Sequence, residues 1–433
     1  MKNFFEFKKL NTSFRKELIG ALSTFSAMAY IIVVHPTILH EAGLPFGPIM
    51  TVTILITALS TFLMGVFGKV PLAVAPAMGV SAYFTFTLIQ KNQMAVSEGL
   101  FVVFLSAITI LLMNIFHLRK KILNEIPHEL ITGITGGIGL FLITVGLKQI
   151  GLVKVGTLGL ISLNSIDPIV FLFTLSGILL IILFEKLKIK AAFILSILII
   201  WMAANSLGYS QLNGIIDSPP SILPTLFLLK APETLSYDFF KAFLSIFLVT
   251  LFDSSAGLLT LRKIMPKEAR DFDMQKALYP DAVGSSIGAI MGTSSLAIHL
   301  ESMAGIHSGA RSGFSSLIVS FLFLLCLFFY PLASSIPFFA SAPCIIAIGF
   351  LMAKQLKNLE TSSTIEKIAP ILTALVMPMT LSLYQGFKIG FISLGLISLL
   401  YPKKINRSKI ILFFSGLFLL EQLLILLNQY FGI

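Results

Sequence analysis

Apolar stretches of membrane-spanning length alternate with short polar breaks along almost the whole chain. A helix needs about 20 residues to cross the hydrocarbon core of a bilayer. The pattern therefore predicts an all-α polytopic membrane protein with about 14 transmembrane segments. The expected segments are 18–39, 49–68, 71–90, 98–117, 130–150, 167–185 and 189–207, then 238–260, 277–292, a short interrupted piece at 294–309, 313–332, 336–353, 366–384, 386–401 and 409–430.

Composition and charge support the same class. The chain is 56% hydrophobic and 12% charged, whereas soluble domains carry about 25% charged residues. The net charge of +11 could indicate nucleic acid, but the basic residues gather in breaks such as 119–121, 186–190 and 262–276. The intervening breaks 40–48 and 333–337 contain no Lys or Arg. This alternation predicts a cytoplasmic N-terminus in the cell (inner) membrane, and no nucleic-acid partner.

Two of the expected segments are interrupted by helix-breaking residues. The first, 70–87, contains Pro71, Pro76 and Gly79, and the second, 291–313, contains several glycines. They occupy corresponding positions in the two halves. Broken helices at matching positions are typical of transporter substrate sites, because they expose backbone dipoles near the membrane midplane. Glycines that serve only helix packing are the alternative explanation.

Three acidic residues lie within or at the mouth of the segments around the second break. An ionised side chain inside a spanning helix costs about 3 kcal/mol on insertion scales, so each requires a reason. Asp253, Asp281 and Glu301 are all surrounded by small or hydroxyl residues. Such carboxylates can accept hydrogen bonds from a neutral ligand and can carry a proton. Asp281 follows Pro280 and is equally well explained as a helix-start residue.

Other chemistry is less well supported by the sequence. His299 and His307 lie near Glu301, and His35 ends the first segment; all three could titrate near neutral pH, but we do not expect them to be the proton carriers. The stretch 284–288 matches the G-x-S-x-G pattern of hydrolases, but that motif needs a preceding strand. Here it falls in an expected spanning helix, where its glycines would form a packing face. We therefore expect neither an enzyme nor a metal or cofactor.

Four sequence blocks carry a resemblance to a known family. They are ELIGALSTFSAMAYIIVVHPTIL at 17–39, PLAVAPAMGVSAYFTFT at 71–87, TLFDSSAGLL at 250–259 and DAVGSSIGAIMGTSSLAIHLESMAGIHSGARSG at 281–313. The chain resembles the AzgA-like purine (adenine/hypoxanthine/guanine) permeases of the nucleobase cation symporter, or xanthine-uracil permease, superfamily. The resemblance implies a 7+7 inverted repeat with two broken helices, split into a core and a gate domain. The core would comprise 14–118 and 238–332, and the gate 126–207 and 336–430.

The resemblance also implies roles for particular residues. In this family the eighth and tenth segments present acidic residues to the purine, which fall here on Asp253 and Glu301. Asp281 matches an aspartate with a supporting or coupling role. The chain departs from its relatives at positions that bear on specificity: Ala77 replaces a glycine, Ser81 an asparagine, Thr250 an acidic residue and His299 a smaller or hydroxyl residue, and Ala256 stands for glycine or serine.

The sequence thus predicts a secondary active transporter that imports a purine nucleobase by proton symport and alternating access. Ser81, Asp253, His299 and Glu301 would enclose the base, and Tyr83 or Phe84 would stack on it. Asp281 and Thr250 would support the binding site or couple transport to the proton.

The alternatives are a transporter of uracil, xanthine or a small anion with the same fold, or a channel or membrane-embedded enzyme. An anion site would need a buried cation; Arg311 is the candidate near the broken segments, but we expect it at a cytoplasmic helix end. Assembly as a homodimer is left open.

Overall fold

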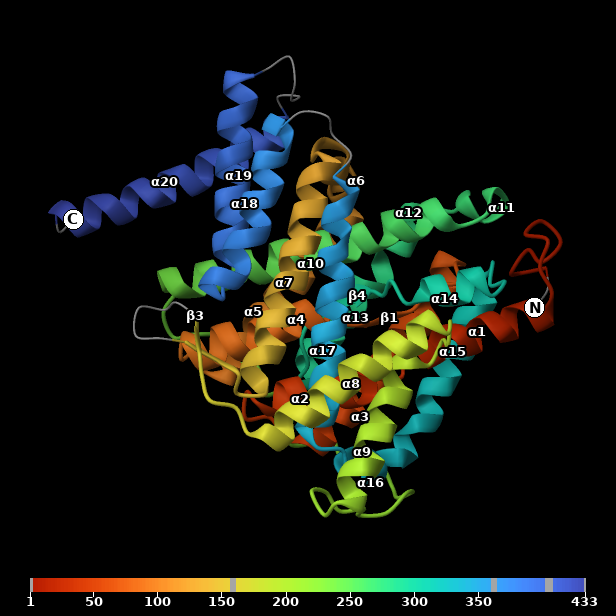
Figure 1. Ribbon diagram of the computed structural model, residues 1–433. Coiled ribbons are helices and arrows are strands. Elements are labelled where there is room, and N and C mark those ends of the chain that lie inside the picture. Colours follow the sequence, from red (N-terminus) through yellow and green to blue (C-terminus); the bar gives the residue numbers. More distant parts are fainter. Residues whose placement is uncertain (1–2, 156–160, 360–363, 402–407, 432–433) are drawn as a thin grey trace.

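The computed structural model describes residues 3–155, 161–359, 364–401 and 408–431, and these are mostly helical (Figure 1). The first half contains α1 (Phe14–Met28), α2 (Ile31–His40), α3 (Phe46–Leu63), η1 (Met64–Gly68), β1 (Val74–Pro76), α4 (Met78–Ala82), η2 (Tyr83–Lys91), α5 (Val96–Ile115), α6 (Leu118–Glu125), α7 (His128–Gln149), β2 (Val153–Val155), β3 (Ile161–Leu163), α8 (Pro168–Lys186) and α9 (Ala192–Ser206).

The second half repeats the alternation of long helices and a short strand. It contains α10 (Tyr237–Ile264), α11 (Lys267–Arg270), α12 (Met274–Ala277), α13 (Tyr279–Met291), β4 (Leu296–Ile298), α14 (Ser302–His307), α15 (Gly313–Leu325), η3 (Cys326–Phe329), α16 (Tyr330–Ser334), α17 (Phe338–Ala353), η4 (Lys354–Asn358), α18 (Thr364–Thr380), α19 (Leu383–Leu400) and α20 (Lys409–Phe431).

Nine helices within the described residues are long and apolar enough to cross a membrane. Further expected segments are present as shorter helices, for instance α9 with 15 residues and α13 with 13. The two interrupted segments fall below spanning length for a different reason, because each is a strand followed by a short helix. The prediction of an all-α polytopic chain with two broken helices is therefore confirmed.

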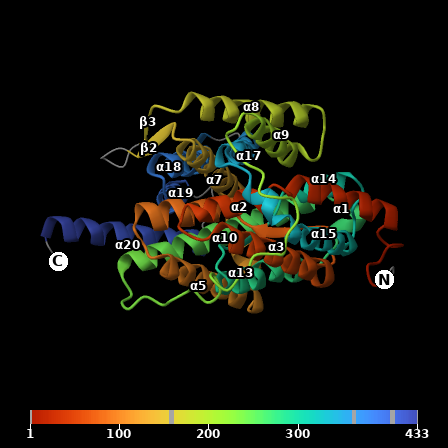
Figure 2. The same cartoon turned by 90° about the horizontal axis from the view of Figure 1, so that it is seen from below.

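The helices form two packed groups. In one, α7 packs against α17 and α18, and α18 packs against α19 (Figure 1). In the other, α5 packs against α10 and α13, α3 against α13 and α15, and α1 against α14 and α15. Figure 2 shows α8 and α9 as an outer layer beside α17, which they also contact. The site described below lies where α17 faces the second group.

The two broken segments meet as a pair of short antiparallel strands. Val74 of β1 lies opposite Ile298 of β4, and Pro76 lies opposite Leu296. All six residues of these strands are buried. Non-helical backbone is tolerated at membrane depth only where protein surrounds it, so the strand pair must lie inside the protein, where neighbouring helices cover it.

Hydroxyl side chains from neighbouring helices satisfy the strand backbone. This explains why serines and threonines cluster in these apolar helices, since an unpaired buried amide is costly. The bonds run from Ala73 N to Ser302 Oγ (3.0 Å), from Val74 N to Thr61 Oγ1 (3.0 Å), from Leu296 N to Ser285 Oγ (2.8 Å) and from Ile298 N to Ser254 Oγ (3.3 Å).

Glycines allow the helices to approach these strands closely. A Cβ atom on Gly257 of α10 would lie 2.6 Å from the carbonyl oxygen of Ile298, and one on Gly284 of α13 would lie 3.0 Å from the Leu296 side chain and would clash with Ser60 Oγ of α3. Gly292 ends α13 with a φ of 96°, in the left-handed region that favours glycine. The stretch 284–288 lies within α13, as the packing interpretation requires.

Candidate functional site

A cavity of about 640 Å³ lies beside the strand pair. Its walls come from the end of α1, the start of α4, the middle of α10, the segment from β4 through α14, and the end of α17 with η4. The lining residues are Ala27, Tyr30, Ala77, Met78, Gly79, Lys190, Asp253, Ala297, Ile298, His299, Leu300, Glu301, Met303, Ala304, His307, Ile348, Leu351, Met352, Lys354, Gln355 and Lys357.

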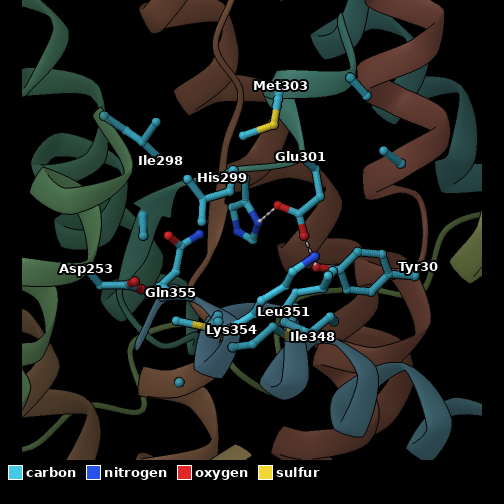
Figure 3. Close-up of a pocket in the computed structure, with 18 of the residues that line it drawn as sticks. Tyr30, Asp253, Ile298, His299, Glu301, Met303, Ile348, Leu351, Lys354 and Gln355 are labelled. Atoms are coloured by element: carbon cyan, nitrogen blue, oxygen red, sulfur yellow. Dashed lines mark hydrogen bonds and ion pairs between the residues drawn. The ribbon is translucent and has the colours of Figure 1, made fainter. Parts of the chain in front are cut away.

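Glu301 is held in the cavity wall by two side chains from different parts of the fold. The hydroxyl of Tyr30 donates a hydrogen bond of 2.6 Å to its Oε1 atom. The Nδ1 atom of His299 lies 3.3 Å from its Oε2 atom. Figure 3 shows both contacts, with Glu301 and His299 on the side of the cavity opposite α17. The carboxylate, which lines the cavity, is therefore fixed in orientation.

The hydrogen bonds of His299 limit where its protons can be. Its Nε2 atom lies 3.2 Å from the carbonyl oxygen of Pro76, which can only accept, so Nε2 carries a hydrogen. The contact between Nδ1 and Glu301 then needs one further proton, on either the imidazole or the carboxyl group. In both arrangements the His299–Glu301 pair holds one shared proton and has no net charge.

Asp253 contributes a second carboxylate from α10. It lies on the opposite side of His299 from Glu301 in Figure 3, and it interacts electrostatically with both residues. Its carboxylate has no hydrogen-bond or ion-pair partner among the described residues, although it lines the cavity. A carboxylate of this kind is available to accept hydrogen bonds from N–H groups of a ligand.

The start of α4 presents backbone groups to the same cavity. Ala77, Met78 and Gly79 line it, and α4 continues without interruption into η2. The amide of Ala77 is bonded to the carbonyl of Ser295 at 2.9 Å. The next amides, at the first helical positions, have no partner within the helix. They can donate to acceptor atoms of a bound molecule.

Four of the expected site residues lie away from the cavity in this structure. Ser81, Tyr83, Phe84 and Thr250 are at most 2% exposed and are absent from its lining. Ser81 Oγ lies 2.7 Å from Ser294 Oγ and so links the two broken segments. Asp253, His299 and Glu301, by contrast, are brought together. The aromatic ring in the wall is that of Tyr30, which lies between α1 and α2.

Asp281 is part of a fully buried ion pair with Arg119 of α6. The guanidinium donates to both carboxylate oxygens, at 3.1 and 2.8 Å, and both side chains are 0% exposed. Arg119 also donates to Ser255 Oγ (3.2 Å) and to the carbonyl of Leu278 (3.3 Å). Asp281 therefore joins α13 to α6, and it does not line the cavity.

The remaining polar candidates have structural partners. His35 lies 2.8 Å from Thr53 Oγ1 and 3.4 Å from Ser294 Oγ, fully buried. Arg311 donates to the carbonyls of Ile306 and Ala310 and does not line the cavity, whereas His307 does. No group of three or more His, Cys, Asp or Glu within the described ranges could hold a metal ion.

The sequence pattern did not indicate the part of the wall that comes from the α1–α2 junction, from α17 and η4, and from the turn before α9. Tyr30, Lys190, Lys354, Gln355 and Lys357 were not singled out. A tyrosine in an apolar run and lysines at a helix end are ordinary features of a membrane protein. Only the folded chain places them beside Glu301 and Asp253.

The overall fold is shared with solved structures of membrane transporters. The transmembrane domain of the cyanobacterial bicarbonate transporter BicA aligns with a TM-score of 0.67 at 16% identity, covering 88% of this chain and 98% of that one. The murine anion transporter Slc26a9 in its inward-facing state aligns with a TM-score of 0.67 at 14% identity, covering 90% and 69%. These neighbours share the 7+7 inverted-repeat fold, which confirms the expected architecture.

The chain belongs to the Permease family, whose model Xan_ur_permease matches residues 15–389. It is 34% identical over 396 residues to the adenine permease AdeP of Escherichia coli K12, covering 91% of this chain and 89% of AdeP. It is 33% identical over 406 residues to the guanine/hypoxanthine permease PbuG of Bacillus subtilis, covering 90% and 92%. The expected nucleobase permease family is confirmed, and the chain is a multi-pass membrane protein.

Proposed function

We propose that this protein imports a purine nucleobase, adenine, hypoxanthine or guanine, by proton symport and alternating access. The observation that carries the proposal is the meeting of Asp253, His299 and Glu301 in one cavity beside the two broken segments. The relatives named as adenine and guanine/hypoxanthine permeases support the same substrate class. In this account the carboxylates accept N–H groups of the base, and the amides at the start of α4 face its acceptor atoms.

An anion is a weaker candidate for the same cavity. The side chains nearest the strand pair are two carboxylates and a histidine, and Arg311 is turned away toward backbone carbonyls. An anion placed beside Asp253 would be repelled, because its carboxylate has no cationic partner within the described residues. Uracil and xanthine present N–H groups as purines do, so only competition experiments separate them from the proposed substrates.

The proton shared by His299 and Glu301 is the one we assign to coupling. Loss of that proton would leave a net negative charge facing the Asp253 carboxylate, which is unfavourable in a partly dehydrated cavity. A bound base excludes water and so strengthens this repulsion; binding of the proton and binding of the base would therefore favour each other. Tyr30 keeps its hydrogen bond to Glu301 in both states, so it would position the carboxylate without carrying the proton.

The orientation follows from the basic residues at the open side of the cavity. Lys190, Lys354 and Lys357 are exposed and line it, and basic residues favour the cytoplasmic side. We therefore propose an inward-facing state in the inner membrane, with the N-terminus in the cytoplasm. The cavity lies between the proposed core, 14–118 and 238–332, and the proposed gate, 126–207 and 336–430, which would move relative to each other.

The test is uptake of radiolabelled adenine, hypoxanthine, guanine and uracil in cells that lack their own nucleobase permeases. We expect uptake of at least one purine by the wild type, a decrease as external pH rises, and loss of accumulation with an uncoupler. Glu301→Gln, which keeps the shape of the side chain but cannot be ionised, should abolish accumulation.

Lys186→Gln is the matched control, because Lys186 is exposed at the end of α8 and does not line the cavity. It should leave uptake unchanged. Uptake of no purine above background by a wild-type protein that reaches the membrane would refute the nucleobase proposal. Uptake that is unaffected by Glu301→Gln would refute the assigned site.

A further inference from the structure

The cavity is larger and more asymmetric than a nucleobase alone requires. A volume of about 640 Å³ lies within the range of pockets that enclose drug-sized ligands, whereas a purine is a compact two-ring molecule. The wall formed by Asp253, His299 and Glu301 carries carboxylates and a shared proton. The wall formed by the end of α17, η4 and the turn before α9 carries three lysines.

The three lysines share features that suit an anionic group. Lys190, Lys354 and Lys357 are exposed, line the same cavity, and have no hydrogen bond or ion pair with another described residue. Glu185 of α8 interacts electrostatically with Lys354 but forms no ion pair with it. The rest of this wall consists of the uncharged Gln355 and the apolar Ile348, Leu351 and Met352, which give an anion no competing charge.

We propose that the open cavity binds a purine nucleoside monophosphate from the cytoplasmic side. This inference rests on the proposed function, since the base would occupy the Asp253 and Glu301 wall. The ribose would lie along the apolar surface of α17, and the phosphate would lie among Lys190, Lys354 and Lys357. Figure 3 shows Lys354 and Leu351 across the cavity from Glu301, and both walls line the same cavity.

The chemistry explains why such a ligand would inhibit and not be carried. Lysine binds phosphate as a point charge, and three of them can share one dianionic group. The base wall belongs to the proposed core and the three lysines belong to the proposed gate, so a ligand that bridges the two walls would hold core and gate apart and keep the cavity open on this side. Import of a base would then slow when its phosphorylated product accumulates inside the cell.

A phospholipid headgroup offers the same phosphate chemistry at the same depth. The two sources differ in one respect, because only a nucleotide should compete with the base for the cavity. The lipid composition around the protein is therefore part of the test.

The experiment measures displacement of a labelled purine from the purified full-length protein in nanodiscs. The competitors are adenosine, inosine and guanosine monophosphates, the corresponding nucleosides, and inorganic phosphate. We expect the monophosphate of the transported base to displace it better than the nucleoside does. In the triple variant Lys190→Gln, Lys354→Gln, Lys357→Gln, displacement should weaken about tenfold or more, while affinity for the base itself stays unchanged. Higher salt should weaken displacement by the nucleotide selectively.

Lys186→Gln again serves as the control and should bind both ligands as the wild type does. Equal displacement by nucleotide and nucleoside, or equal nucleotide affinity in wild type and triple variant, would overturn the inference. An effect of the lysines that appears only in nanodiscs with anionic lipid would assign them to lipid headgroups and would also overturn it. Absence of base binding in the wild type would instead count against the proposed function.

Discussion

The buried pair formed by Arg119 and Asp281 leads to a prediction that separates a structural role of Asp281 from a role in proton coupling. Both side chains are fully buried, and the guanidinium is bonded to both carboxylate oxygens. Removing one partner of such a pair leaves an uncompensated charge and costs about 3–5 kcal/mol. Asp281→Ala and Arg119→Met should therefore each lower thermal stability strongly in detergent or nanodiscs and reduce the amount of folded protein in the membrane.

The double variant Arg119→Met, Asp281→Leu should recover most of that loss, because apolar residues of similar volume often replace a buried pair without net cost. The groups that Arg119 releases keep other partners. The carbonyl of Leu278 still accepts from Asn114 Nδ2 at 2.7 Å, and Ser255 Oγ still donates to the carbonyl of Leu251.

The assay combines melting temperature with proton-driven uptake by each variant. A supporting role predicts that the double variant recovers both stability and coupled uptake. If the double variant is stable but takes up purine without a proton gradient, Asp281 is a coupling residue and our reasoning is wrong. If Asp281→Ala melts as the wild type does, the pair does not hold α6 against α13.

Two further substitutions test the geometry of the cavity. Tyr30→Phe removes the 2.6 Å hydrogen bond to Glu301, and hydrogen bonds to charged groups contribute about 1.5–3 kcal/mol. We therefore expect the KM for uptake to rise about tenfold with little change in melting temperature. An unchanged KM would contradict this. Gly257→Ala would place a methyl group 2.6 Å from the carbonyl of Ile298, and overpacking costs about 1–3 kcal/mol, so stability and uptake should both fall. Gly416→Ala is its control, because nothing lies within 4 Å of the added Cβ, and an equal effect of both alanines would refute the close approach of α10 and β4.

The carboxylates could be identified from sequence because an acidic residue in an apolar run is costly. Asp253 and Glu301 both line the cavity, although nothing in the sequence states that they meet there. Tyr30 could not be identified in this way, because it stands 271 residues from the carboxylate that it contacts. Its partner depends on how α1 packs against α14, which is a property of the tertiary structure.

The broken segments show a similar limit. Prolines and glycines predicted where 70–87 and 291–313 would be interrupted, but three-residue strands are too short to give an alternating pattern of their own. Which side chains face the cavity after the break depends on the strand register and on the helix phase that follows it. Tyr83 and Phe84 therefore fell into buried positions in η2, away from the cavity of this state, while Ala77 and Gly79 line it.

The most direct test of the central claim is transport by the purified protein in liposomes. An imposed gradient, acidic outside, should drive accumulation of one labelled purine in the wild type, and the uncoupler should release it. Glu301→Gln should show no accumulation, although the protein remains folded. Equilibration of the purine without regard to the proton gradient, or equal accumulation by Glu301→Gln, would contradict the account.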